Sequence, residues 1–193
     1  MKKIILSAIV STCFLASSVN AVESDFFVKA NIVYSKLNKV KSIKSKKDTT
    51  FAIGTGYNYL DNVRIDLTFD HFVNPKFKSK DKTISGDINT LLLNGFVDLV
   101  DISIAKIFAG FGTGAGQAQA KVSGDQDPKN NGKAKQRYSL AYALYLGAGA
   151  EFAPGITAEV MCSYRSLGET KKLNDSDIKF QGKHLSVGLR FDL

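Results

Sequence analysis

Apolar and polar residues alternate with a period of two along most of this chain. Over residues 63–70 every odd position is apolar and every even position is polar or charged. Such alternation predicts a β-strand with one apolar and one polar face. The pattern predicts eight strands, at residues 26–34, 49–59, 63–70, 89–99, 107–116, 138–151, 156–165 and 184–193. We therefore expect an all-β chain.

The connections between these segments alternate strictly in length. Four are long and polar, at residues 35–48, 73–87, 121–137 and 167–177, and three are short, around residues 60–62, 99–101 and 153–155. Eight antiparallel strands with both ends of the domain on one side of a membrane need four outer loops and three inner turns. The sequence therefore predicts an eight-stranded antiparallel up-and-down transmembrane β-barrel.

The polar faces of the predicted strands carry too much charge for the core of a soluble barrel. An apolar face turned outward requires lipid around it, and eight strands leave an interior only wide enough for side chains. Buried charges need partners, so we favour a structural salt-bridge network over an ion path or proton relay. The predicted lumen network comprises Lys29, Arg64, Asp66, Asp70, Glu151, Glu159, Arg165 and Arg190.

Both ends of the chain carry the features of exported outer-membrane proteins. A basic start, an apolar run over residues 4–18 and a small-residue site ending at Ala21 predict a cleavable signal peptide. The alternating final strand, which closes on Leu193, resembles the signal by which outer-membrane barrels are recognised for insertion. We expect a signal peptide at residues 1–21 and an outer-membrane β-barrel domain at residues 22–193.

The basic charge is concentrated in the predicted outer loops. Without residues 1–21 the chain has 24 Lys and Arg (26 − 2) against 18 Asp and Glu, a net charge of +6. The four long loops together carry +9, which leaves −3 for the strands and turns. Nucleic acid is a poor partner for charge outside the cell; lipopolysaccharide phosphates, sulfated glycans and acidic host proteins fit better. The candidate ligand-binding lysines of the first two loops are Lys36, Lys39, Lys41, Lys44, Lys46, Lys47, Lys76, Lys78, Lys80 and Lys82.

Residues that could carry catalysis or bind metal are few. His184 and Ser186 share one strand face, as a base and a nucleophile could, and some eight-stranded barrels deacylate lipid A with such a pair. Those enzymes need the pair to face lipid, whereas the alternation here turns it inward. Two histidines and Cys162, the one cysteine after residue 21, predict neither a metal site nor an internal disulfide. We expect no catalysis and no cofactor.

Four alternating glycines, Gly110, Gly112, Gly114 and Gly116, invite comparison with a nucleotide-binding loop. Their spacing fails the G-x-G-x-x-G pattern, and no helix is expected after them. All four fall on one face of a strand, where a missing side chain leaves room for larger lumen residues opposite. We expect a packing role for these glycines.

Several segments together resemble a known family. They are Thr55-Gly56-Tyr57, residues 63–67, residues 108–112 and the closing residues 184–191. In this order they resemble the small opacity-type outer-membrane barrels, and more narrowly the rickettsial adhesin-type surface barrels. The resemblance implies adhesion to host cells or to serum proteins such as vitronectin, and sometimes to heparan sulfate. Family adhesion motifs lie in variable loops, so no binding residue carries over. Leu193 departs from the Phe that these families usually place last.

The expected function is that of an outer-membrane surface protein, an adhesin that binds host-cell or serum proteins through its lysine-rich loops. The expected partners are outer-membrane lipid and lipopolysaccharide, the barrel-assembly machinery through the last strand, and host vitronectin or sulfated glycans. Nucleic acid is not expected. Two alternatives remain open. One is a structural barrel whose loops tether lipopolysaccharide, and the other is a lipid A-modifying enzyme.

Overall fold

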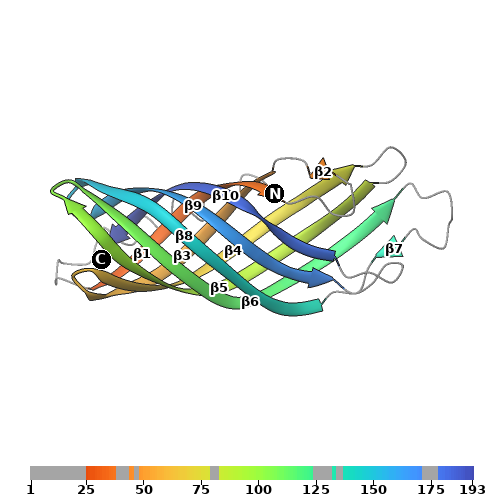
Figure 1. Ribbon diagram of the computed structural model, residues 1–193, viewed down its shortest axis with the longest axis horizontal. Helices are drawn as coiled ribbons and strands as arrows, with labels where there is room; N and C mark the ends of the chain where they lie inside the picture. Colours follow the sequence, from red (N-terminus) through yellow and green to blue (C-terminus); the bar gives the residue numbers. More distant parts are fainter. Residues whose placement is uncertain are drawn as a thin grey trace.

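The computed structural model describes residues 25–37, 44–45, 48–78, 83–123, 132–133, 137–170 and 178–193. The predicted signal peptide lies outside these residues. Among the described residues, no helix is long and apolar enough to cross a membrane. Figure 1 shows long strands that run obliquely along the molecule. The strands are β1 (Phe26–Leu37), β2 (Lys44–Ser45), β3 (Asp48–Leu60), β4 (Val63–Lys78), β5 (Thr83–Ile102), β6 (Ala105–Ser123), β7 (Gly132–Lys133), β8 (Arg137–Ala153), β9 (Ile156–Thr170) and β10 (Ile178–Asp192).

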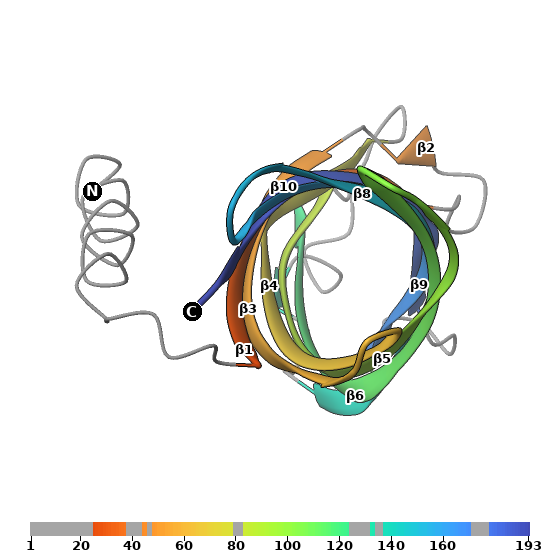
Figure 2. The ribbon, with the colours of Figure 1, turned by 90° about the vertical axis from the view of Figure 1, so that its left-hand side faces the viewer.

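The eight long strands form a closed ring (Figure 2). Each pairs in antiparallel fashion with the long strand that follows it in the chain, and β10 pairs with β1 to close the barrel. At one end, the Leu193 N–H donates to the Phe26 carbonyl at 2.9 Å, so the end of β10 lies beside the start of β1. The short strands β2 and β7 extend the sheet at the other end, against β4 and β6. This confirms the predicted eight-stranded barrel.

The register around the ring measures how far the strands tilt. The register partner of Lys36 is Lys183 on β10. Continuing from partner to partner once around the barrel returns to β1 at Phe26, a shift of ten residues (36 − 26). Ten residues at about 3.3 Å each, tilted by about 40°, rise about 25 Å. An apolar band of an outer-membrane barrel is about that tall. On β1 the outward residues are apolar from Phe26 to Tyr34 and Lys36 is the next outward residue, so the apolar stretch of this strand spans about that height.

The two faces of the wall differ as the alternation predicts. On β4, Phe69 points outward and is 43 % exposed, while its neighbour Asp70 is fully buried inside. The same contrast holds along β10, where Val187 is exposed and Ser186 is buried. Because the apolar residues face outward and the polar residues inward, the barrel has the inside-out arrangement that lipid requires.

Several strands extend further than the sequence predicts. Much of the predicted loop at 73–87 is strand, because β4 runs to Lys78 and β5 starts at Thr83. β6 similarly continues to Ser123, and β9 to Thr170. Apolar outward positions are required only within lipid, so a strand can continue above the bilayer wherever a neighbouring strand supplies hydrogen bonds. The four outer loops are correspondingly shorter than expected.

One predicted turn is misplaced. Residues 99–101 lie on β5, and the chain reverses between Ile102 and Ala105 instead. The register shifts between Asp98 and Val100, and Ser103 has a positive φ of 52° that permits the tight reversal. A serine rarely adopts this conformation, and neither glycine nor proline stands near it, so the sequence offered little sign of the turn.

Gly110 and Gly112 leave space for larger side chains opposite, as expected, whereas a Cβ at Gly114 or Gly116 would meet a backbone carbonyl. Gly112 pairs with Asn94 across β5 and β6, and a Cβ at Gly112 would overlap the Asn94 side chain. Replacing Gly112 with Ala should lower the free energy of unfolding by about 1–3 kcal/mol, because Asn94 would be forced from its buried hydrogen bonds. Urea unfolding in detergent micelles measures this loss. Gly95→Ala is the matched control, since a Cβ at Gly95 meets open space. Equal stability of the two variants would contradict the packing role.

Candidate functional site: the lumen and the outer end

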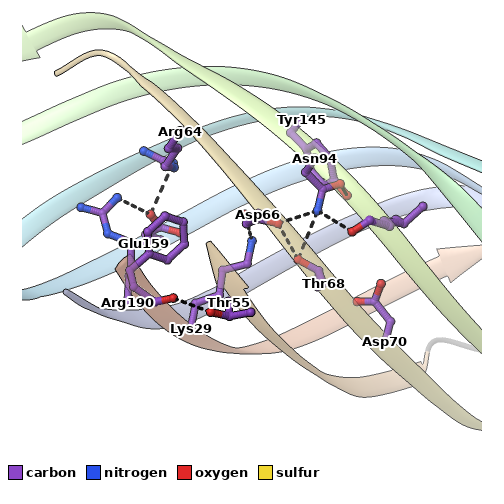
Figure 3. A network of polar contacts seen from close by, with 12 residues as sticks. Lys29, Thr55, Arg64, Asp66, Thr68, Asp70, Asn94, Tyr145, Glu159 and Arg190 are labelled. Atoms are coloured by element: carbon purple, nitrogen blue, oxygen red, sulfur yellow. Dashed lines mark hydrogen bonds and ion pairs between the residues drawn. The ribbon is translucent and has the colours of Figure 1, made fainter. Parts of the chain in front are cut away.

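One group of lumen charges surrounds Glu159 (Figure 3). The buried Glu159 carboxylate lies 3.4 Å from Arg64 Nη2 and 3.4 Å from Arg190 Nη1. Arg64 also donates through Nη1 to Asp98 Oδ1 at 3.1 Å. Arg64 therefore bridges two carboxylates, those of Glu159 and Asp98. Arg190 contacts Asp192 as well, through Nε at 3.2 Å.

A second group is centred on Asp66 and is almost entirely removed from solvent. Asp66 forms an ion pair with Lys29 and accepts hydrogen bonds from Thr68 Oγ1 at 2.8 Å and Asn94 Nδ2 at 2.7 Å. The Tyr145 hydroxyl donates to Asn94 Oδ1 at 2.9 Å. Each polar group in the cluster finds a partner, so the charge of Asp66 is well compensated.

The third group lies nearer the outer end and consists of Asp70 and its donors. The fully buried Asp70 accepts from Arg165 Nη1 at 2.9 Å and from Thr90 Oγ1 at 2.9 Å. Arg165 Nε donates to Ser163 Oγ at 3.0 Å. The ion pair between Arg165 and Asp70 joins β9 to β4 across the lumen.

Aromatic rings pack between and against these charged groups. The Arg64 guanidinium carbon lies 4.2 Å from the Phe108 ring centroid and 5.0 Å from that of Phe96. Phe96 meets Phe108 edge-on, and Arg165 lies 5.3 Å from the Tyr145 ring. Such cation–π contacts stabilise buried cations further. The rings and charges together occupy the middle of the lumen.

One residue was wrongly assigned to the lumen network. Glu151 is exposed, and its carboxylate accepts from the Gly155 N–H at 3.0 Å in the turn between β8 and β9. It stands next to a register shift at the end of its strand, beyond the closed part of the barrel. The sequence prediction also left Asp98, Asp192 and Tyr145 out of the set, although all three share the inward parity of their strands.

The candidate catalytic pair does not form. His184 and Ser186 are both buried on the lumen side, but His184 Nδ1 lies 2.8 Å from Ser35 Oγ on β1. Ser186 Oγ donates instead to the Met161 carbonyl at 3.3 Å. Neither side chain faces lipid, where acyl chains would be.

The ten candidate lysines are only partly within the described residues. Lys36 is exposed at the top of β1. Lys44 lies on β2, and Lys76 and Lys78 lie on the extension of β4. Lys39, Lys41, Lys46, Lys47, Lys80 and Lys82 fall outside the described residues.

The sheet extension at the outer end places lysines directly opposite one another in the register. Lys44 on β2 pairs with Lys78 on β4, and Lys121 on β6 pairs with Lys133 on β7. Like charges at directly opposite positions destabilise a sheet. Lysines therefore occupy opposing backbone positions at this end of the sheet.

Comparison with known proteins identifies the family. The profile of the outer membrane protein β-barrel domain matches residues 6–191. The chain belongs to this family. A Rickettsia conorii protein named "Putative adhesin" is 33 % identical over an alignment 249 positions long, which covers 100 % of both chains. Together these matches place the chain among outer-membrane barrels with relatives named as adhesins, as the sequence resemblance implied.

Solved structures support the same fold. Neisserial surface protein A aligns with a TM-score of 0.67 at 17 % identity, covering 88 % of this chain and 98 % of that one. Ail of Yersinia pestis, in complex with the heparin analogue sucrose octasulfate, aligns with a TM-score of 0.54 at 15 % identity, covering 88 % and 100 %. At these identities the likeness shows a shared outer-membrane barrel fold.

Proposed function

We propose that this barrel is a surface adhesin that binds anionic host ligands, sulfated glycans above all, through the lysines of its outer end. The observation that carries the proposal is the opposition of Lys44 to Lys78 and of Lys121 to Lys133 in the sheet extension. Closely spaced sulfates would neutralise such pairs simultaneously. The net charge of +9 in residues 35–48, 73–87, 121–137 and 167–177 supports the same class of ligand.

The comparisons support the proposal at two levels. The relative from Rickettsia conorii bears an adhesin name, and Ail, which shares the fold, has been solved with a heparin analogue. We propose acidic serum proteins such as vitronectin as further ligands of the same lysines. In this proposal the lumen network stabilises the barrel. Recognition of β10 by the barrel-assembly machinery during membrane insertion remains a prediction.

The test replaces Lys39, Lys41, Lys44, Lys46 and Lys47 with Ser. Attachment of cells displaying this variant to immobilised heparin and vitronectin should fall to a small fraction of the wild-type level. Wild-type attachment should itself weaken steeply as salt rises to about 0.15 M, where screening shortens to about 8 Å. Counting attached cells at several salt concentrations measures both effects.

Two results decide the interpretation of this test. Lys171→Ser combined with Lys172→Ser is the control, because those lysines belong to the acidic fourth loop, and this variant should attach normally. If the five-Ser variant attaches as well as wild type at physiological salt, the first loop does not bind, and residues 121–137 become the candidate. A barrel that only tethers lipopolysaccharide would attach equally well in every variant.

A further inference from the structure

The outer wall of the barrel carries a groove across β1, β10, β9 and β8. Its volume is about 560 Å³, and its apolar floor faces outward into the lipid. The exposed residues that line the groove on the outer wall include Tyr34, Leu146, Cys162, Tyr164 and Leu185. We call this surface the wall groove.

Two lysines border the wall groove at its outer end. Lys36 on β1 and Lys183 on β10 are direct register partners, and both are exposed. Among the described residues, neither forms an ion pair with a carboxylate. Two cations at directly opposite positions repel each other, so an anion between them would be stabilising.

The lysine pair stands at the outer edge of the apolar wall, where lipid headgroups are expected. The outward positions of β1 are apolar from Phe26 to Tyr34, and Lys36, the next outward position, lies about 25 Å above Phe26 along the barrel axis, a typical height for an apolar band. Tyr34 and Tyr164 lie just below the lysines, at the level where aromatic side chains mark the membrane interface. The Tyr164 hydroxyl is held by Gln181 Oε1 at 3.3 Å.

The wall is different on the other side of the ring. There, the boundary between apolar and polar residues runs through His71, Asn89 and Gln117, which are register partners on β4, β5 and β6. His71 Nδ1 contacts Asn89 Oδ1, and Asn89 Nδ2 donates to Gln117 Oε1 at 3.5 Å. These side chains satisfy one another, and they provide no opposed pair of cations like that above the wall groove.

We propose that the wall groove binds one phosphorylated lipid of the outer leaflet, lipid A, with a phosphate between Lys36 and Lys183. An acyl chain of the same molecule lies against Leu146, Cys162 and Leu185. A soluble anion would neutralise the lysines but would leave the apolar floor to bulk acyl chains, so it would use only half of the site. A zwitterionic phospholipid would fill the floor but bring no net charge to the lysines. Lipid A carries both negatively charged phosphates and acyl chains. The wall groove is separate from the proposed adhesive lysines of the outer loops.

The test measures lipid binding to the full folded protein in a zwitterionic detergent. Lipid A and lipid A stripped of its phosphates are titrated separately, and bound lipid is counted by native mass spectrometry. Wild type should prefer the phosphorylated lipid by about 25-fold, since each of the two lysines near a lipid surface contributes about fivefold. The double variant Lys36→Gln with Lys183→Gln should lose that preference. Lys106→Gln, an exposed lysine at the opposite end of the barrel, should keep it.

A second variant tests the apolar part of the site. Cys162→Trp should fill the floor of the groove and weaken binding of both lipids equally. The proposal is overturned if wild type binds the two lipids with equal affinity, or if the double lysine variant retains the preference. If soluble heparin displaces lipid A, the lysine pair binds polyanions in general, and the proposal is overturned as well.

Discussion

Replacing Arg165 with Met is expected to lower the free energy of unfolding of the barrel by about 3–5 kcal/mol. Asp70 is fully buried, and within the described residues Arg165 is its cationic partner, at 2.9 Å. The Thr90 hydroxyl would remain as a donor, but one neutral hydrogen bond compensates poorly for an unpaired buried charge. Urea unfolding in lipid vesicles, followed by the heat-dependent shift in gel migration, measures the change.

The double variant Arg165→Met with Asp70→Leu separates loss of charge pairing from loss of packing. Removing both charges should restore much of the lost stability, because a buried ion pair is often replaceable by apolar residues of similar size. Lys106→Met is the exposed control. The Lys106 side chain is about half exposed, and its contacts with Asp98 and Asp101 are long, at 3.6 Å and 3.8 Å, so each should be worth less than about 1 kcal/mol. An Arg165→Met variant no less stable than Lys106→Met would refute the buried-pair explanation.

The inward and outward faces of the strands could be predicted because they follow directly from the period of two. The inward position of Asp66 and the outward position of Leu67 follow once one face must meet lipid, and no knowledge of partners is needed. Closure into eight strands followed from the alternation of loop lengths. These features depend on local pattern and on the solvent, both of which are present in the sequence.

Partners across the lumen could not be predicted in the same way. Arg64 and Glu159 lie on β4 and β9, which are not neighbours, and the register shift of ten residues around the ring brings them level. Local irregularities added further errors. The register shift beside Glu151 moved it out of the expected network, and no local pattern indicates such shifts.

The outer ends of the strands were missed for a related reason. Lys76 and Lys78 were expected in a loop because residues 73–87 form a long and polar segment. Above the bilayer that face contacts water, so alternation of hydrophobicity no longer identifies a strand. The pairing of β4 with β2 and β5 shows that hydrogen bonding continues there without the apolar pattern.

Planar bilayers containing the folded wild-type protein are expected to show at most small, irregular conductance. Eight strands leave little room, and Phe96, Phe108 and Tyr145 are all buried inside with the Arg64 guanidinium stacked on Phe108. The lumen is thus filled by side chains that would have to move for ions to pass. Single-channel recording at fixed voltage measures this, and a steady, ion-selective current of porin size from wild type would contradict a filled lumen.

Truncating the aromatic rings should convert this barrel into a leaky one. In the variant Phe96→Ala with Phe108→Ala, the edge-on pair is lost and a cavity opens beside Arg64. Current steps should then become more frequent in the fraction that remains folded, as judged by gel migration. Phe111→Ala is the matched control, because Phe111 lies on the same strand as Phe108 but faces lipid and is 53 % exposed. If the control and the double variant conduct alike, the buried rings are not what blocks the lumen, and the ion pairs of Asp66 and Asp70 must close it instead.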